Sequence, residues 1–202
     1  MQTSGLTYEP TYRGLAIETR PGFGLRTEIL DVLEDLLHDR SNRGGMTAAV
    51  MLDIRVPPGW VCSEDNRAIK RFCRRFAAYL QQQGIASHHI WVQKHPEYSS
   101  DPHYVVVLLV DAQFSWSHDL HLAKANLLWA REIETTQRGG LIDYCGLDGD
   151  PSTAPVLMIH WGWLGFEGDC SSAFRALSRI ARVETSTNAA DDDIAFGSSR
   201  TW

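Results

Sequence analysis

The sequence lacks several features that would assign it to a class at once. Its four cysteines, Cys62, Cys73, Cys145 and Cys170, form no Cys-x-x-Cys pair, which argues against a zinc or dithiol redox site. No stretch approaches the roughly 18 to 20 apolar residues of a membrane span, and the first residues lack the basic-then-apolar order of a signal peptide. A Gly-x-Ser-x-Gly elbow and a Gly-x-x-x-x-Gly-Lys phosphate loop are also missing. We therefore expect a cytoplasmic protein with reduced thiols that neither hydrolyses nucleotides nor uses a serine nucleophile.

The chain also lacks a net positive charge. It carries 19 basic and 25 acidic residues, for a formal charge of -6. Proteins that gain affinity from phosphate contacts usually present a basic surface, so any nucleic-acid site here must be a local patch. With 202 residues, 44% of them hydrophobic, the chain is long enough to bury a core.

Apolar periodicity predicts alternating helices and strands. Residues 1–24 have no sustained apolar period, which predicts an irregular N-terminal arm. Residues 25–202 are expected to form one domain with a mobile acidic segment at 188–193. Helices are predicted at 27–37, from a capping segment at 63–66 to about 84, at 121–135 and at 172–183; strands are predicted at 46–56, 90–92, 104–110, 139–144 and 156–163. The alternation indicates an α+β fold.

Five ordered segments of the chain carry a family resemblance. They are Leu52–Pro57 with Asp65-Asn66, Ile90-Trp91-Val92-Gln93-Lys94, Asp101-Pro102-His103-Tyr104-Val105, Leu177–Val183, and Phe196-Gly197-Ser198-Ser199-Arg200. Together they resemble the inovirus replication-protein-like (YagK/YfjJ-type) family of phages and prophages, relatives of rolling-circle replication initiators of the His-hydrophobic-His endonuclease class. The resemblance implies an antiparallel sheet of about five strands with helices packed on its faces, similar to the initiator nuclease fold.

The resemblance also implies a catalytic centre. In this family two histidines and an acid hold a divalent metal, and a tyrosine hydroxyl attacks the DNA phosphate. Here His103 stands at the first histidine position, but Val105 stands at the second and Lys94 where the acid is expected. Arg179 occupies the tyrosine position, and Arg182 the lysine position that follows. We therefore expect a member of the family that does not cleave DNA and needs no metal cofactor.

Two clusters of basic residues are candidate nucleic-acid contacts. On the predicted last helix Arg175, Arg179 and Arg182 are spaced i, i+4, i+7 and would share one face. Guanidinium groups on that face could hold phosphates. The helix after residue 66 adds a second cluster of Arg67, Lys70, Arg71, Arg74 and the adjoining Arg75. The simpler interpretation of either cluster is a solvated helix face.

Other polar and aromatic groups favour structural roles. The spacing of His118 and His121, with His88 and His89, suggests a metal site, but no cysteine or acid completes the ligand set. The segment from His160 to Phe166 holds Trp161 and Trp163, which could stack on unpaired bases or pack against the sheet; packing is the favoured reading.

Three functions remain open at this point. The favoured one is a catalytically inactive initiator-like protein of a phage, prophage or mobile element that binds DNA, single-stranded or hairpin, or a replication or regulatory protein. The first alternative is an active metal-dependent nicking enzyme in which His103 works with neighbouring groups such as His95, Glu97 and Tyr98 or Tyr104. The second is a protein-interaction module, which the acidic balance favours. No membrane partner is expected.

Overall fold

Two long apolar strands lie at the centre of the fold. In the computed structural model, β5 (Gly45–Ile54) and β7 (His103–Asp111) run antiparallel, with register pairs from Thr47 opposite Asp111 to Ile54 opposite Tyr104. Residues 104–110 of β7 are all buried. A strand covered on both faces requires such a continuous apolar run, so the prediction of a central strand here is confirmed.

The other strands of the central sheet flank this pair. The order is β11-β6-β7-β5-β8, and β9 pairs with the first half of β5 on the same side as β8. All of these pairings are antiparallel, which confirms the expected fold class. The flanking strands are β6 (Ser87–Lys94), β8 (Ile142–Tyr144), β9 (Val156–Trp161) and β11 (Phe196–Ser198). The structure describes residues 5–60, 63, 65–94, 103–112, 118–137, 139–146, 156–162, 166–184 and 195–199.

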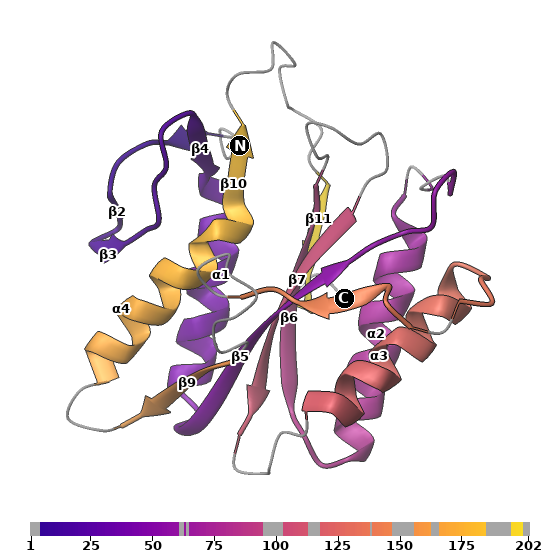
Figure 1. Cartoon of the computed structure of the whole chain (residues 1–202). Helices are drawn as coiled ribbons and strands as arrows, with labels where there is room; N and C mark the ends of the chain where they lie inside the picture. The colour runs from indigo at the N-terminus through magenta and orange to yellow at the C-terminus, as the bar shows by residue number, and fades with distance from the viewer. Residues whose placement is uncertain are drawn as a thin grey trace.

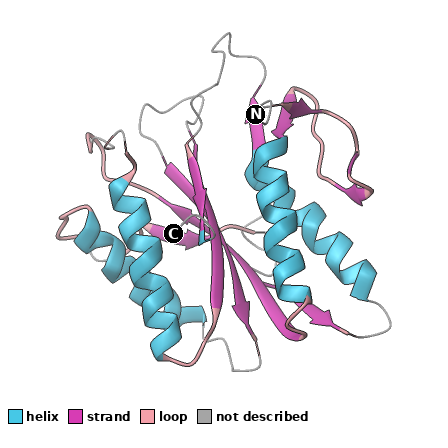
Figure 2. Cartoon of the chain, turned by 180° about the vertical axis from the view of Figure 1, so that it is seen from behind, coloured by secondary structure: helices cyan, strands magenta, loops and turns pink. Residues whose placement is uncertain are grey.

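Helices cover both faces of this sheet (Figure 1, Figure 2). On one face lie α2 (Arg67–Gln82) and α3 (His118–Glu132); on the other lie α1 (Thr27–Ser41) and α4 (Phe166–Leu177). The predicted apolar positions of α1, namely Ile29, Leu30, Leu33, Leu36 and Leu37, are all buried. Among the residues that the structure describes, no helix is long and apolar enough to cross a membrane.

The core beneath α2 and α3 is rich in aromatic rings. Trp129 of α3 makes edge contacts with Phe72 of α2 and with Tyr104 of β7, at centroid distances of 5.7 and 6.0 Å. The indole Nε1 of Trp129 donates to the carbonyl of Arg55 at 2.7 Å. Such a bond allows a tryptophan to be fully buried without losing a hydrogen bond. The core beneath α1 and α4 is instead mostly aliphatic.

The start of α2 uses the predicted capping segment. The backbone N–H of Arg67 donates to Ser63 Oγ at 3.1 Å and to Asp65 Oδ1 at 3.2 Å. Asn66 adopts a left-handed conformation with φ of 52°, which asparagine tolerates better than most residues. Its side chain accepts a hydrogen bond from the hydroxyl of Tyr104 at 2.8 Å. The segment therefore both caps α2 and ties it to β7.

The N-terminal segment differs from the expected irregular arm. It contains β1 (Leu6–Thr7), a hairpin of β2 (Thr11–Tyr12) and β3 (Leu15–Ala16), and β4 (Phe23–Arg26). β4 lies between β1 and β10 (Arg182–Glu184) in a second antiparallel sheet. Strands of two to four residues are too short to show a period, and β4 pairs with a distant part of the chain, so local patterning could not predict them.

The predicted helix at 172–183 is wrong in its second half. α4 ends at Leu177, a 3-10 turn follows at Ser178–Ala181, and Arg182 begins β10 with an extended backbone. The Ser178 hydroxyl donates to the carbonyl of Arg175 at 2.7 Å, and such side-chain bonds compete with helical ones. Arg175, Arg179 and Arg182 therefore do not share a helix face.

β11 packs against β6 through a glycine that faces a tryptophan. Gly197 lies opposite Trp91 in the register, and a Cβ on Gly197 would lie 2.9 Å from the Trp91 Nε1. Trp91 is almost fully buried, so its ring has little room to move aside. The close approach explains why this position requires a glycine.

Substituting Gly197 tests this packing. We expect Gly197→Ala to lower the free energy of unfolding by about 1–3 kcal/mol, because the added methyl overpacks the Trp91 ring. Gly168→Ala is the control: it lies in α4 with nothing within 4 Å of the added Cβ, and alanine favours a helix by up to about 1 kcal/mol over glycine. Urea unfolding measures both, and equal effects would contradict the packing account.

Candidate functional site

The structure brings together the five positions that the resemblance assigns to catalysis. Lys94 and His103 lie directly opposite each other at the ends of β6 and β7. Val105 lies two residues further along β7, so it faces the same side of the sheet as His103 and joins the aliphatic core there. Arg179 and Arg182 reach the same region from the 3-10 turn and β10, through contacts with Lys94 and with the N-terminal segment. We call these residues, with Glu18 and Asp53, the strand-end cluster.

Lys94 holds the turn that follows α4. Its Nζ donates to the carbonyl of Ile180 at 2.8 Å and to that of Arg182 at 2.6 Å. These carbonyls lie at the end of the 3-10 turn, where backbone acceptors lack partners within the turn. An ammonium group satisfies two of them at once, whereas a carboxylate would repel both. A lysine at this position therefore has a defined structural role.

Arg179 and Arg182 point inward and share one carboxylate. Arg182 Nη2 forms a close hydrogen bond with Glu18 Oε1, and Arg179 Nε lies 3.6 Å from Glu18 Oε2. Arg179 Nη1 also donates to the carbonyl of Gly146 at 2.8 Å. Their side chains are only 14% and 13% exposed. Burial lowers the pKa of Arg182, and the nearby Glu18 carboxylate acts in the opposite direction.

The Glu18 carboxylate was missed by the sequence interpretation. It lies in the segment expected to be irregular, and it is 164 residues from Arg182. A backbone bond reinforces the tie, since the N–H of Glu18 donates to Ser178 Oγ at 2.9 Å. The available signal was indirect: arginines on a partly apolar helix need a carboxylate if they turn inward. Nothing in the local pattern indicates which carboxylate that is.

His103 lies near one carboxylate. Its Nε2 is 3.8 Å from Asp53 Oδ1, and the other oxygen of Asp53 accepts a hydrogen bond from Arg55 Nε at 3.0 Å. Among the described residues, no group of three or more His, Cys, Asp or Glu side chains could hold a metal ion. His95, Glu97 and Tyr98 lie outside the described residues. Tyr104 faces the opposite side of β7, where its hydroxyl is bonded to Asn66.

The predicted basic helix is α2, and its charges differ in their surroundings. α2 has five basic residues and no acidic one. Arg71 and Arg75 pair with the carboxylate of Glu132 on α3, whose side chain is fully buried. Arg67 pairs with Asp65 at the surface. Within the described part of the chain, Lys70 and Arg74 have no carboxylate partner.

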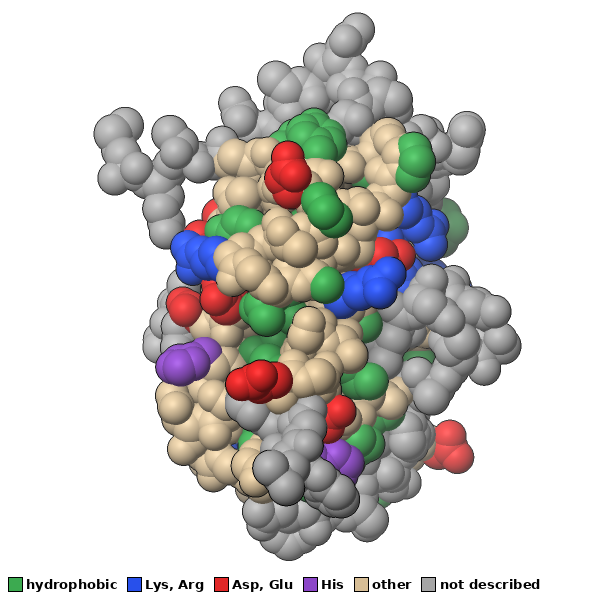
Figure 3. Space-filling view, turned by 90° about the vertical axis from the view of Figure 1, so that its left-hand side faces the viewer, with side chains coloured by type: hydrophobic (Ala, Val, Ile, Leu, Met, Phe, Trp, Pro, Cys, Tyr) green, Lys and Arg blue, Asp and Glu red, His purple; other side chains and the backbone are tan. Residues whose placement is uncertain are grey.

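The opposite layer has the opposite charge. α1 carries the five acids Glu28, Asp31, Glu34, Asp35 and Asp39, and its Arg40 is buried with Nε donating to Thr47 Oγ1 at 3.1 Å. Figure 3, which faces the side of α4 and the β2–β3 hairpin, shows acidic and basic side chains scattered among uncharged surface. Arg175 is exposed on α4, but no continuous basic surface is seen on this side.

The histidines singled out in the sequence lie in two different elements, His88 and His89 in β6 and His118 and His121 in α3. His121 Nδ1 lies 3.5 Å from the Tyr79 hydroxyl, between α3 and α2. His89 is buried in β6, and neither of its ring nitrogens has a hydrogen-bond partner in the part of the chain that the structure describes. His118 begins α3. Trp161 is buried, with Nε1 donating to Thr47 Oγ1 at 2.7 Å, which confirms packing for this indole; Trp163 lies outside the described residues.

Comparisons with known proteins found no match for this chain among family models, curated proteins or solved structures.

Removing the shared carboxylate tests the role of Glu18. We expect Glu18→Ala to lower the free energy of unfolding by about 2 kcal/mol, because two largely buried guanidinium groups lose their counter-ion. Arg20→Ala is the control, since Arg20 lies 3.7 Å from the same carboxylate but is half exposed, and it should cost less than about 0.5 kcal/mol. If both variants lose a similar free energy of unfolding in urea, Glu18 does not stabilise the fold through its ion pairs with Arg179 and Arg182.

The buried imidazole of His89 predicts a pH-dependent stability. Burial lowers its pKa to about 4, and the neighbouring His88 contributes, whereas a histidine in an unfolded chain titrates near about 6.5. Between these values the unfolded chain binds a proton that the folded protein does not. This part of the stability is therefore complete above pH about 6.5 and falls as the pH drops towards 4, by up to about 3 kcal/mol. His89→Leu should show a flatter profile in urea unfolding at several pH values, and parallel profiles would refute the assignment.

Proposed function

We propose that this chain is a non-cleaving relative of rolling-circle replication initiators that binds DNA through α2. The observation that supports DNA binding most is the composition of α2, which has five basic residues and no acidic one in a protein of net charge -6. The site of action would be the cytoplasm, on the DNA of a phage, prophage or mobile element.

The geometry of α2 suits a phosphate backbone. Arg67, Arg71 and Arg74 are spaced i, i+4, i+7, so they follow one stripe of the helix, and all three are exposed. The basic part of the helix, residues 67–75, spans about 12 Å, the rise of three to four nucleotides at about 3.4 Å each. The stripe could therefore contact successive phosphates of one strand.

The division of charge between the two helical layers supports the same conclusion. Long-range repulsion from the acids of α1 would weaken DNA binding if they lay beside α2. The sheet separates the two layers (Figure 1), and charges further apart than about 10 Å are largely screened at physiological salt. A local positive field over α2 is thus compatible with an acidic protein.

The strand-end cluster supports the absence of cleavage. Lys94 bonds two backbone carbonyls, and Arg179 and Arg182 share Glu18. Arg179 and Arg182 therefore connect the C-terminal segment to the N-terminal one, and Lys94 connects it to β6. A guanidinium cannot act as the tyrosine nucleophile would, and a lysine would repel a divalent metal. We infer that the positions of the family's catalytic site now hold side chains that stabilise the fold.

The binding surface is tested with paired double variants. Lys70→Ala/Arg74→Ala removes two cations of α2 that pair with no carboxylate among the described residues, and Arg43→Ala/Arg175→Ala removes two exposed cations elsewhere. We expect the first variant to bind single-stranded and hairpin DNA about tenfold or more weakly, with a salt slope smaller by about 1.4 to 1.8. Fluorescence anisotropy titrations at about 50 mM and about 200 mM salt measure the affinity and its salt dependence.

The control variant should bind like the native protein. Equal losses in both variants would show non-specific attraction and contradict a site on α2. No binding by the native protein at low salt would contradict DNA binding altogether and favour the protein-interaction module.

The same DNAs test cleavage. With Mg²⁺ or Mn²⁺ present, we expect neither nicked product nor a covalent protein–DNA adduct on a denaturing gel. An adduct that disappears in Tyr98→Phe would overturn the non-cleaving assignment and establish the nicking enzyme instead.

A further inference from the structure

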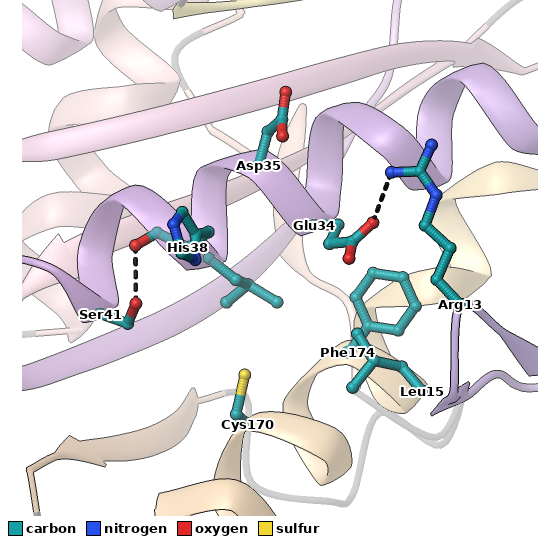
Figure 4. Close-up of a pocket in the computed structure, with 9 residues that line it drawn as sticks. Arg13, Leu15, Glu34, Asp35, His38, Ser41, Cys170 and Phe174 are labelled. Atoms are coloured by element: carbon teal, nitrogen blue, oxygen red, sulfur yellow. Dashed lines mark hydrogen bonds and ion pairs between the residues drawn. The ribbon is translucent and has the colours of Figure 1, made fainter.

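A cavity of about 280 Å³ opens between α1, α4 and the β2–β3 hairpin, on the face of the sheet opposite to α2 (Figure 4). Its lining combines an apolar wall of Leu15, Leu37 and Phe174 with polar groups from α1, including Glu34 and Asp35. Cys170 reaches towards this space from α4, and Glu34 from α1, as Figure 4 shows. We propose that the cavity binds a small organic ammonium ion, a protonated amine on an apolar body.

Local geometry explains how the cavity forms. The residues Glu34, Leu37, His38 and Ser41 follow one stripe of α1 at spacings i, i+3, i+4 and i+7. The hairpin turns at Arg13 and Gly14, which both have positive φ, as a two-residue turn of this kind requires. This turn places Arg13 and Leu15 over the space between the two helices without filling it.

The charge around the cavity favours a cation. Among the described lining residues Arg13 is the one guanidinium. It is divided between two carboxylates, since Nη1 bonds Glu34 Oε2 at 3.0 Å and Nη2 lies 2.8 Å from Asp31 Oδ1. Because one guanidinium faces two carboxylates, negative charge exceeds positive charge among these three side chains, and Asp35 belongs to the same lining.

The apolar wall restricts the class of cation. Leu37 and Phe174 are almost fully buried and form the back of the wall, so the hydrophobic surface that a ligand can reach comes from the half-buried Leu15 and Cys170. A hydrated metal ion would gain nothing from this surface. An amine on an aliphatic or aromatic body would bury its apolar part against the wall and place its ammonium group beside Glu34.

Protection of Cys170 provides the assay. Burial raises the pKa of this thiol, and Glu34 contributes, so the thiol should react slowly with iodoacetamide. Peptide mass mapping measures the reaction of Cys170 separately from that of the other cysteines. A bound ligand should slow the reaction by a factor of 1 + [L]/Kd, about tenfold at about ten times Kd. The probes are 2-phenylethylamine, the neutral 2-phenylethanol and the anionic 3-phenylpropionate.

We expect 2-phenylethylamine to protect Cys170 from iodoacetamide. The alcohol should bind at least about tenfold more weakly than the amine, and the carboxylate should give no protection. Glu34→Gln keeps the shape of the wall and should weaken the amine about tenfold, and Asp35→Asn is a second variant if the first does not fold. Glu167→Gln, an exposed acid of α4 outside the lining, should leave protection unchanged. Equal protection by all three probes, no protection by the amine, or an unchanged Glu34→Gln would overturn the proposal. No DNA is involved, so its failure would leave the function proposed for α2 untouched.

Discussion

The pairing of β5 with β7 is the interaction on which the other parts of this structure depend. Both strands are apolar on both faces, so the sheet they form is stable in water only if each face is covered. α2 and α3 cover one face with aromatic rings around Trp129, and α1 and α4 cover the other with aliphatic side chains. The outer surfaces of the two layers never meet, which allows one to be basic and the other acidic.

The sequence predicted the elements whose patterns are long and local. The apolar run of β7 and the periodic leucines of α1 were recognised correctly because burial alone determines them. The helix at 172–183 was extended too far, since Arg182 is extended by its pairing with Leu25 of β4, a contact between distant residues. The short strands of the N-terminal segment were missed for the same reason.

The strand-end cluster was foreseen as a set of positions but not as a structure. The family resemblance named Lys94, His103, Arg179 and Arg182 as one set of positions, although no local spacing connects them. It did not reveal what these side chains contact. Glu18 and Glu132 were not anticipated, because a carboxylate that pairs with arginines across the fold has no signature in its own segment. Opposite charges far apart in a sequence reveal their pairing only once the chain has folded.

The position of β5 has a consequence for how the protein is made. Its first residues pair with β9, so that Gly45 lies opposite Trp161, and its last residues pair with β8. A ribosome delivers β5 long before either partner, and one edge of the most apolar strand pair must wait for them. Such an edge is open to pairing with other chains. Fast translation through residues 112–161, or a chaperone that shields β5 meanwhile, would therefore govern how much of this protein reaches its native state.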